Sequence, residues 1–176
     1  MQQIAGSDDM GIILLTDMKR LRAITVVCDE PMMQQIMLRV RNPRQCRTML
    51  PEAMLSLLPS KYEIMVFGLF QGQYQVVIMD EKGNSTRLRM SDAVLLMLIS
   101  DIPLYIEESL MARQSTPYDE TATGIAIPIN TMDVPRLETA LQSAIDDENY
   151  ELASQLRDEI NRRKSPAVSP STTTTL

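Results

Sequence analysis

The sequence predicts an α+β protein. An antiparallel or mixed sheet with packed helices is expected at residues 1–112, followed by a two-helix antiparallel hairpin at 133–164. Short runs rich in aliphatic and aromatic residues, separated by turns that contain Gly, Asp or Asn, indicate strands in the first half. Helical stretches stand apart from these runs instead of alternating regularly with them, which favours α+β organisation. Near the end, apolar residues recur every three or four positions, as in paired helices.

Composition is typical of a soluble globular protein, since 44% of the 176 residues are hydrophobic and 23% are charged. No apolar run approaches the roughly 18 residues of a membrane-spanning helix. The first residues lack the basic and apolar regions of a signal peptide. Cys28 and Cys46 are too few for a disulfide framework. We therefore expect a cytoplasmic location, reduced thiols and no membrane partner.

The chain contains no histidine. This excludes the Ser-His-Asp triad, the Cys-His pair and zinc sites with histidine ligands. Any catalysis must rest on carboxylates, lysine, tyrosine, serine, arginine or a metal held by carboxylates.

Charge is unevenly distributed. Residues 1–113 hold 12 Lys and Arg against 13 Asp and Glu, whereas residues 114–176 hold 5 against 10. The first part nevertheless contains the run RVRNPRQCR, which carries Arg39, Arg41, Arg44 and Arg47 and no acid. Such a run can contact nucleic-acid phosphates, or it can be a solvated loop after a helix.

The first expected elements are a hairpin and two helices. Residues 12–15 and 21–27 are strand-like, and the stretch between them indicates a turn. Pro31 begins a helix whose apolar face comprises Met33, Ile36, Met37 and Val40. Pro51 begins a second helix, with an apolar face of Met54, Leu57 and Leu58.

Three strands of an antiparallel meander are predicted next, at 62–70, 73–79 and 85–89. Residues 92–100 predict a helix that is apolar around nearly its whole circumference, so we expect it to be buried on most sides. A last short strand is expected at 104–106, after Pro103 ends the helix.

Two segments carry no sustained period. Residues 113–132 indicate a linker, although GIAIPI at 124–129 can dock as an extended segment. Residues 165–176 are of low complexity and are expected to be disordered.

Polar residues gather where the apolar helix begins. Taken alone, Ser91 is an N-cap and Asp92 interacts favourably with the helix dipole. Arg87 and Arg89 lie two positions apart on the preceding strand, so their side chains share one face. Together these groups can instead form a site that binds phosphate or, with other acids, a divalent metal. The sequence alone leaves both interpretations open.

Residues 133–164 form the clearest helical pattern. The first helix carries Leu137, Leu141 and Ile145, and the second carries Tyr150, Ala153, Leu156 and Ile160. A hairpin this small rarely buries both apolar stripes by itself. We therefore expect the hairpin to pack against a partner. This partner is one of three: a second copy of the hairpin, the rest of the chain, or another protein.

This hairpin resembles the UVR motif. The resemblance rests on the run Tyr-Glu-x-Ala-x2-Leu-Arg-Asp-Glu-Ile, from Tyr150 to Ile160. UVR motifs are found in the B and C subunits of nucleotide excision repair and in some stress-response and protease-adaptor proteins. The resemblance implies a protein-interaction hairpin that pairs with another UVR hairpin, through Leu137, Leu141, Tyr150, Leu156 and Ile160.

Residues 10–112 resemble the bifunctional nuclease (BFN) domain. The run RMSDA at 89–93 opens an apolar helix, as Arg-Pro-Ser-Asp-Ala does in that family, and IPLYI follows at 102–106. Met90 replaces the usual proline. The family's Thr-His-Asp stretch falls near Leu50-Pro51-Glu52, where only the carboxylate remains. A BFN domain followed by a UVR motif is a familiar bacterial arrangement.

The BFN resemblance implies a nuclease that hydrolyses phosphodiesters of DNA or RNA. Asp92, with Glu52, would hold Mg²⁺ or Mn²⁺ to activate water, and Arg87 or Arg89 would stabilise charge on the phosphoryl group. Ser91 completes the candidate catalytic set, and Arg39, Arg41, Arg44 and Arg47 would contact the nucleic acid.

A second function class is a non-catalytic adaptor or regulatory protein that dimerises or recruits a protein partner through the hairpin. The acidic C-terminal part suits a protein partner better than a nucleic acid. A third class is a small-ligand or phosphate-binding domain at the same helix start. In each case we expect a homo-oligomer.

Overall fold

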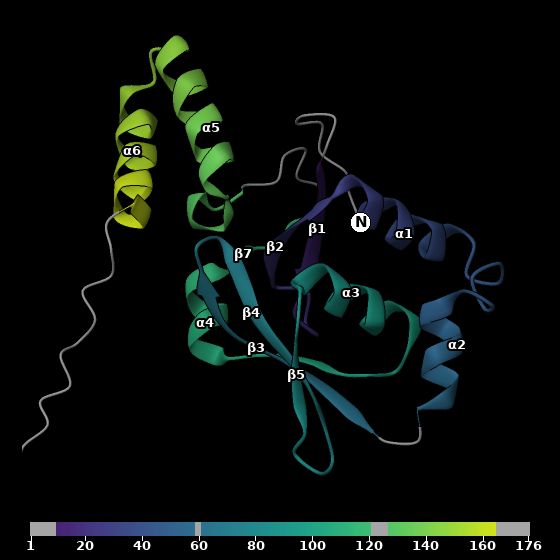
Figure 1. Ribbon diagram of the computed structural model, residues 1–176. Coiled ribbons are helices and arrows are strands. Elements are labelled where there is room, and N and C mark those ends of the chain that lie inside the picture. Colours follow the sequence, from purple (N-terminus) through teal and green to yellow (C-terminus); the bar gives the residue numbers. More distant parts are fainter. Residues whose placement is uncertain (1–9, 59–60, 121–126, 165–176) are drawn as a thin grey trace, which may run out of the picture. The chain divides into compact units, whose positions relative to one another are not determined.

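The computed structural model describes residues 10–58, 61–120 and 127–164 (Figure 1). The chain divides into two compact units, and the boundary lies between Thr131 and Met132. The α+β architecture predicted from the sequence is confirmed, with two sheets and packed helices in the first unit and a helix pair in the second. The expected disordered tail at 165–176, and the part of GIAIPI at 124–126, lie outside the described residues.

The first sheet has the strand order β1-β2-β7. Strands β1 (Met10–Thr16) and β2 (Arg22–Asp29) form the predicted antiparallel hairpin. Asp17 stabilises its turn by accepting a hydrogen bond from the Leu21 amide at 2.8 Å. Strand β7 (Thr116–Pro117) pairs with the start of β2.

The second sheet has the strand order β5-β4-β3-β6. Strands β3 (Tyr62–Phe70), β4 (Gln73–Asp80) and β5 (Ser85–Leu88) form the predicted meander. Gln71 and Gly72 both have positive φ, at 49° and 82°, which suits a two-residue hairpin turn. Strand β6 (Leu104–Ile106) pairs with β3 in parallel, so the sheet is mixed.

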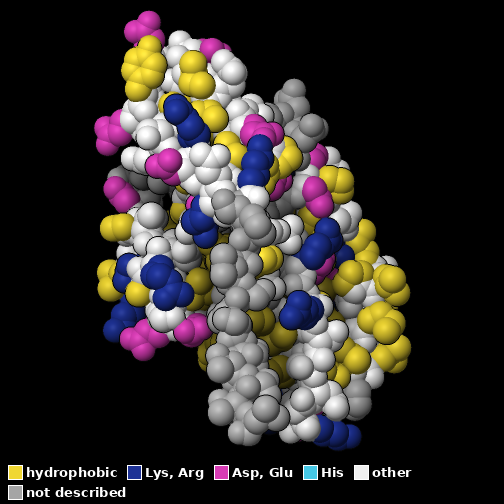
Figure 2. Space-filling view, turned by 60° about the vertical axis from the view of Figure 1, so that its left-hand side comes forward, with side chains coloured by type: hydrophobic (Ala, Val, Ile, Leu, Met, Phe, Trp, Pro, Cys, Tyr) yellow, Lys and Arg dark blue, Asp and Glu magenta, His cyan; other side chains and the backbone are white. Residues whose placement is uncertain are grey.

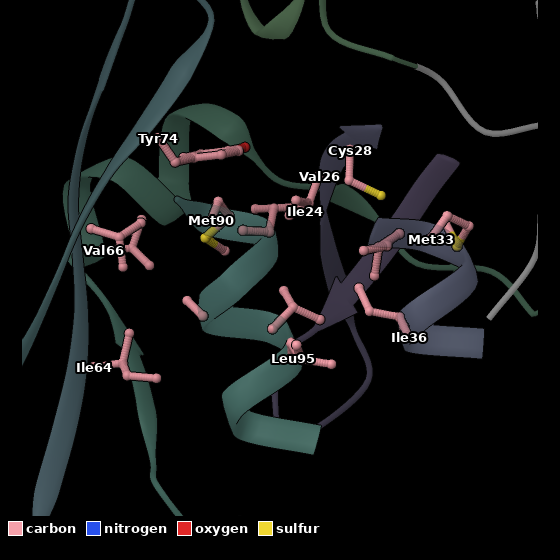
Figure 3. Close-up of a cluster of buried hydrophobic side chains, with 14 of the residues drawn as sticks. Ile24, Val26, Cys28, Met33, Ile36, Ile64, Val66, Tyr74, Met90 and Leu95 are labelled. Atoms are coloured by element: carbon pink, nitrogen blue, oxygen red, sulfur yellow. The ribbon is translucent and has the colours of Figure 1, made fainter. Parts of the chain in front are cut away.

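Helices α1 (Glu30–Arg41) and α3 (Met90–Ile99) share one hydrophobic core with both sheets. Figure 3 shows Met90 and Leu95 of α3 between the labelled side chains of β3 and those of α1. Ile64 and Val66 from β3 are completely buried, as is Ile36 from α1. The expected burial of α3 is confirmed over its first six residues, where five are buried, whereas Leu98 near its end is 39% exposed.

Helices α2 (Leu50–Leu57) and α4 (Glu108–Gln114) complete the first unit. The predicted apolar face of α2 does not enter the core, because Met54, Leu57 and Leu58 are all exposed. Beyond the expected boundary at residue 112, β7 and the short 3₁₀ helix η1 (Ile129–Thr131) still belong to the first unit. Pairing of β7 with β2 keeps this segment attached.

The second unit is the helix pair α5 (Val134–Asp146) and α6 (Tyr150–Lys164). Asp133 caps α5 by accepting a hydrogen bond from the Arg136 amide at 3.0 Å. Asn149 likewise accepts from the Leu152 amide at the start of α6. Among the helices that the structure describes, none is long and apolar enough to span a membrane.

Candidate functional site

The predicted site at the start of α3 contains one arginine between two helix starts. Arg89 donates to both carboxylate oxygens of Asp92, from Nε at 2.7 Å and from Nη2 at 3.1 Å. Its Nη1 atom lies 3.5 Å from Oδ2 of Asp29. Asp29 is the N-cap of α1, where its Oδ1 accepts from the Met32 amide. The side chains of Asp29, Arg89 and Asp92, which we call the helix-start cluster, therefore link the first turns of α1 and α3.

The prediction that Ser91 caps α3 is wrong. The helix begins two residues earlier, with Arg89 at the N-cap, so Ser91 lies inside the first turn and is 7% exposed. Asp92 does lie in the first turn, as predicted, where a carboxylate interacts favourably with the helix dipole.

Arg87 and Glu52, the other two residues of the candidate catalytic set, are not part of the helix-start cluster. Arg87 is exposed on β5, opposite Val77, and has no hydrogen bond or ion pair with the helix-start cluster. Glu52 pairs with Arg39 through both carboxylate oxygens, at 2.7 and 3.1 Å. The structure thus brings Arg89 and Asp92 together, and it adds Asp29.

The electrostatics of the helix-start cluster favour the charged form of Arg89. The hydrogen bonds and charge of Asp92 raise the pKa of Arg89 further above its usual value, and Asp29 adds to this effect. The side chains of Arg89 and Asp29 are 63% and 54% exposed. Solvent screens so exposed an ion pair, and its contribution to stability is about 0–1 kcal/mol. The contact between Arg89 and Asp29 therefore contributes little to holding α1 and α3 together.

The two carboxylates predicted to hold a divalent metal are each paired with an arginine in the structure. Both oxygens of Asp92 accept from Arg89, and both oxygens of Glu52 accept from Arg39. Across the described ranges, no group of three or more Cys, Asp or Glu side chains is placed to hold a metal ion. Hard cations such as Mg²⁺ require several oxygen ligands, so we derive no catalytic step through a metal.

The arginine-rich run divides into one buried and three exposed members. Arg39 is 4% exposed, and its remaining Nη1 donates to the carbonyl and side-chain oxygens of Gln35. Its guanidinium thus forms hydrogen bonds with residues of both α1 and α2. Arg41, Arg44 and Arg47 are exposed. On the face drawn in Figure 2, Lys and Arg side chains lie scattered among Asp and Glu, without a broad basic surface.

Some of the predicted interaction residues of the hairpin are buried and others are exposed. Leu137, Leu156 and Ile160 are buried, at 0%, 1% and 5% exposure, and Ala144 and Ala153 are buried beside them. Helices α5 and α6 pack against each other through this stripe. Leu141 is partly buried, whereas Tyr150 is 69% exposed. The pattern that predicts the hairpin is therefore mostly the contact between its own helices.

A second apolar surface lies around the turn between α5 and α6. Ile145 is 41% exposed and Leu152 is 37% exposed, and both lie within one helical turn of the connection, as Tyr150 does. We call these three side chains the hairpin-tip surface. Four exposed acids accompany them, namely Asp146, Asp147, Glu148 and Glu151. No Lys or Arg occurs between residues 137 and 156, so the tip is apolar with an acidic rim.

Ion pairs hold the opposite end of the hairpin. Glu159 accepts from Arg162 at 2.7 and 2.8 Å and from Arg163 at 2.7 Å. Arg163 also donates to the carbonyl of Met132, at the entry to α5. These hydrogen bonds lower the pKa of Glu159, led by the contact with Arg162. They position the chain that enters the hairpin against its last turn.

Sequence reasoning missed Asp29 and, of the three hairpin-tip residues, Leu152. Asp29 stands two residues before Pro31, and that spacing is typical of a helix N-cap. The spacing identifies the cap but does not show that β2 ends beside α3. Leu152 lies outside the buried stripe of α6, so a search for that stripe passes over it.

Comparison with protein-family models matches residues 134–164 to the UVR family, described as the UvrB/uvrC motif. The resemblance of the hairpin to this motif is thereby confirmed. A comparison with curated proteins finds no match to the chain. The resemblance of residues 10–112 to the BFN domain gains no support from these comparisons and stays a prediction.

Proposed function

We propose that this protein is a non-catalytic adaptor that binds a protein partner through its C-terminal hairpin. The hairpin-tip surface is the single observation that carries the proposal. Ile145, Tyr150 and Leu152 are exposed, although the stripe of the same hairpin is buried between its helices. Exposed aromatic and aliphatic side chains in a small, rigid element are typical of interaction sites.

The acidic rim indicates the chemistry of the partner. Two copies of the tip would bring together Asp146, Asp147, Glu148 and Glu151 of each chain, with no base among them. Like charges at an interface are unfavourable, whereas opposite charges accelerate association. We therefore expect a helical partner, such as another UVR-type hairpin, with an apolar surface flanked by Lys and Arg.

The test compares the full-length protein with a tip variant, Tyr150→Ala/Leu152→Ala, as immobilised baits in an extract of the source organism. Quantitative mass spectrometry should show one basic-flanked partner retained by the parent and at least tenfold depleted on the variant, because interface anchors carry most of the binding energy. Retention should fall with added salt, since the rim charges become screened.

Phe70→Ala is the matched control, because Phe70 is an aromatic residue of similar exposure, 64%, on the first unit. It should retain the partner as the parent does. Circular dichroism should show unchanged helix content in the tip variant, since neither side chain is buried. Equal retention of every protein by the parent and the tip variant would contradict the proposal.

The second candidate function is the nuclease activity that the BFN resemblance implies. One observation favours it: the exposed guanidinium of Arg89 lies beside two carboxylates at two helix starts. Arg89 would bind the phosphodiester and Asp92 would accept a proton from the attacking water. Arg41, Arg44 and Arg47 would contact the flanking phosphates.

This candidate is tested with single-stranded RNA and DNA, with and without Mg²⁺ or Mn²⁺. Hydrolysis by the parent that Asp92→Ala abolishes supports a nuclease. Equal hydrolysis by the parent and Asp92→Ala identifies a contaminant. Dependence on added metal would additionally support the divalent cofactor predicted from the family.

A further inference from the structure

The second sheet has one face in the core and one face turned away from it. Ile64, Val66 and Val76 are buried, and Ile78, Leu88 and Leu104 pack against the same core. Successive side chains of a strand point to opposite faces. The residues between them therefore form an outer face, which includes Glu63, Met65, Val77, Met79, Arg87 and Tyr105, with Gln75 and Ser85 at its margin.

Strand register orders this outer face into rows. Tyr105, Met65, Val77 and Arg87 lie side by side across β6, β3, β4 and β5. In the neighbouring row, Glu63 lies opposite Met79. Met65, Val77 and Met79 are only partly buried, and Tyr105 is 47% exposed. Glu63 and Arg87 thus occupy diagonal corners of an apolar centre.

The two corner charges have no partner within the described chain. Glu63 and Arg87 are both exposed, and neither forms an ion pair or a side-chain hydrogen bond with another described residue. One corner is acidic and the other basic. A surface with this arrangement is complementary to itself when one copy is turned by half a rotation.

We infer that the outer face of the second sheet is the interface of a symmetric homodimer. Two-fold symmetry requires that if Glu63 meets Arg87 of the second copy, Arg87 meets Glu63 of that copy. The axis must then cross the midpoint between these residues. Because Glu63 lies opposite Met79 and Arg87 lies opposite Val77, that midpoint falls on β4, between Val77 and Met79. Both apolar side chains then meet their symmetry mates at the centre.

The expected interface is small. Four strands about 4.8 Å apart give a face roughly 15–20 Å wide. The longest strand, β3, has 9 residues and is about 30 Å long. The face therefore covers roughly 450–600 Å², which is less than the standard interface of about 800 Å² per partner. We therefore expect a concentration-dependent dimer with a dissociation constant in the micromolar range, as for other small interfaces. This inference concerns the first unit and does not depend on the adaptor function of the hairpin.

A charge exchange in the full-length protein tests the inference. Light scattering over a concentration series should give a dimer for the parent, and Glu63→Arg or Arg87→Glu alone should raise the dissociation constant at least tenfold. The double variant Glu63→Arg/Arg87→Glu should restore it to within threefold of the parent, because each new charge again meets its opposite. A monomeric parent, unchanged single variants or an unrestored double variant would each overturn the inference.

Cross-linking locates the axis independently. Val77→Cys treated with a short bis-maleimide should give a covalent dimer, since this position lies beside the axis. Lys82→Cys, in the exposed turn after β4, should give none, and the native Cys28 and Cys46 are buried. Tyr150→Ala should leave the dimer mass unchanged. If Tyr150→Ala abolishes the dimer while Arg87→Glu does not, self-association belongs to the hairpin and the inference fails.

Discussion

Arg39 and Tyr74 are buried polar side chains of the first unit, and they differ in whether their polar atoms find hydrogen-bond partners. Arg39 places three of its nitrogen atoms within hydrogen-bond distance of Glu52 and Gln35. The hydroxyl of Tyr74 is buried and finds no hydrogen-bond partner among the described residues. Burial raises the pKa of Tyr74 to about 12. The two residues therefore predict opposite responses to replacement by an apolar side chain.

Tyr74→Phe removes the hydroxyl that lacks a partner. Burying an unpaired hydroxyl costs about 1–3 kcal/mol, so the variant should be as stable as the parent or more stable, by up to about 1 kcal/mol. Chemical denaturation measures the difference. A loss above about 1 kcal/mol would show that the hydroxyl has a partner in solution.

Arg39→Met should destabilise the first unit by about 3–5 kcal/mol, because it leaves the carboxylate of Glu52 without its partner in a largely buried position. The double variant Arg39→Met/Glu52→Leu removes both charges and should recover most of the loss. Denaturation curves of the three proteins decide this. If the single and double variants are equally unstable, Arg39 acts through packing and not through the ion pair.

At the scale of elements, the hairpin depends on the ion pairs at its open end. The pKa of Glu159 is lowered from its ordinary value of 4.5, so folding favours the ionised carboxylate. The resulting stability is complete above the pKa of the unfolded chain and is lost as pH falls through the lower pKa of the folded state. Hairpin helicity should therefore decrease when the pH falls below about 4.5.

Glu159→Gln should reproduce the acid effect at neutral pH, with a loss of about 1–2 kcal/mol of hairpin stability. Its helicity should also depend less on pH than that of the parent between pH 3 and 6. Glu138→Gln is the matched control, since Glu138 pairs with exposed Lys164. Identical pH profiles for the parent and Glu159→Gln would rule out this carboxylate as the cause.

Elements with a strong local period are predictable from the sequence, and their mutual contacts are not. The alternation in β3 and β4 and the stripe of α6 identify these elements, because each depends on spacing within one segment. The two-residue strand β7 has no period to detect. The burial of Arg39 depends on where α2 lies against α1, and the link from Arg89 to Asp29 depends on how two sheets approach. For the same reason the arginine-rich run identifies a charge-rich loop without identifying its buried member.

At the scale of the whole molecule, the two units should unfold independently. One core joins both sheets of the first unit, whereas the hairpin buries its own stripe. Arg39→Met should therefore accelerate amide hydrogen exchange in β2, β3 and α3 and leave α6 unchanged. Equal acceleration in α6 would show that the units unfold together.

Both sulfur atoms of the cysteines lie inside the first unit, and the chain has no other cysteine. A thiol-reactive dye added to the native protein can label Cys28 or Cys46 only after that unit opens. The labelling rate therefore measures the opening of the α+β unit, and unfolding of the hairpin alone does not change it.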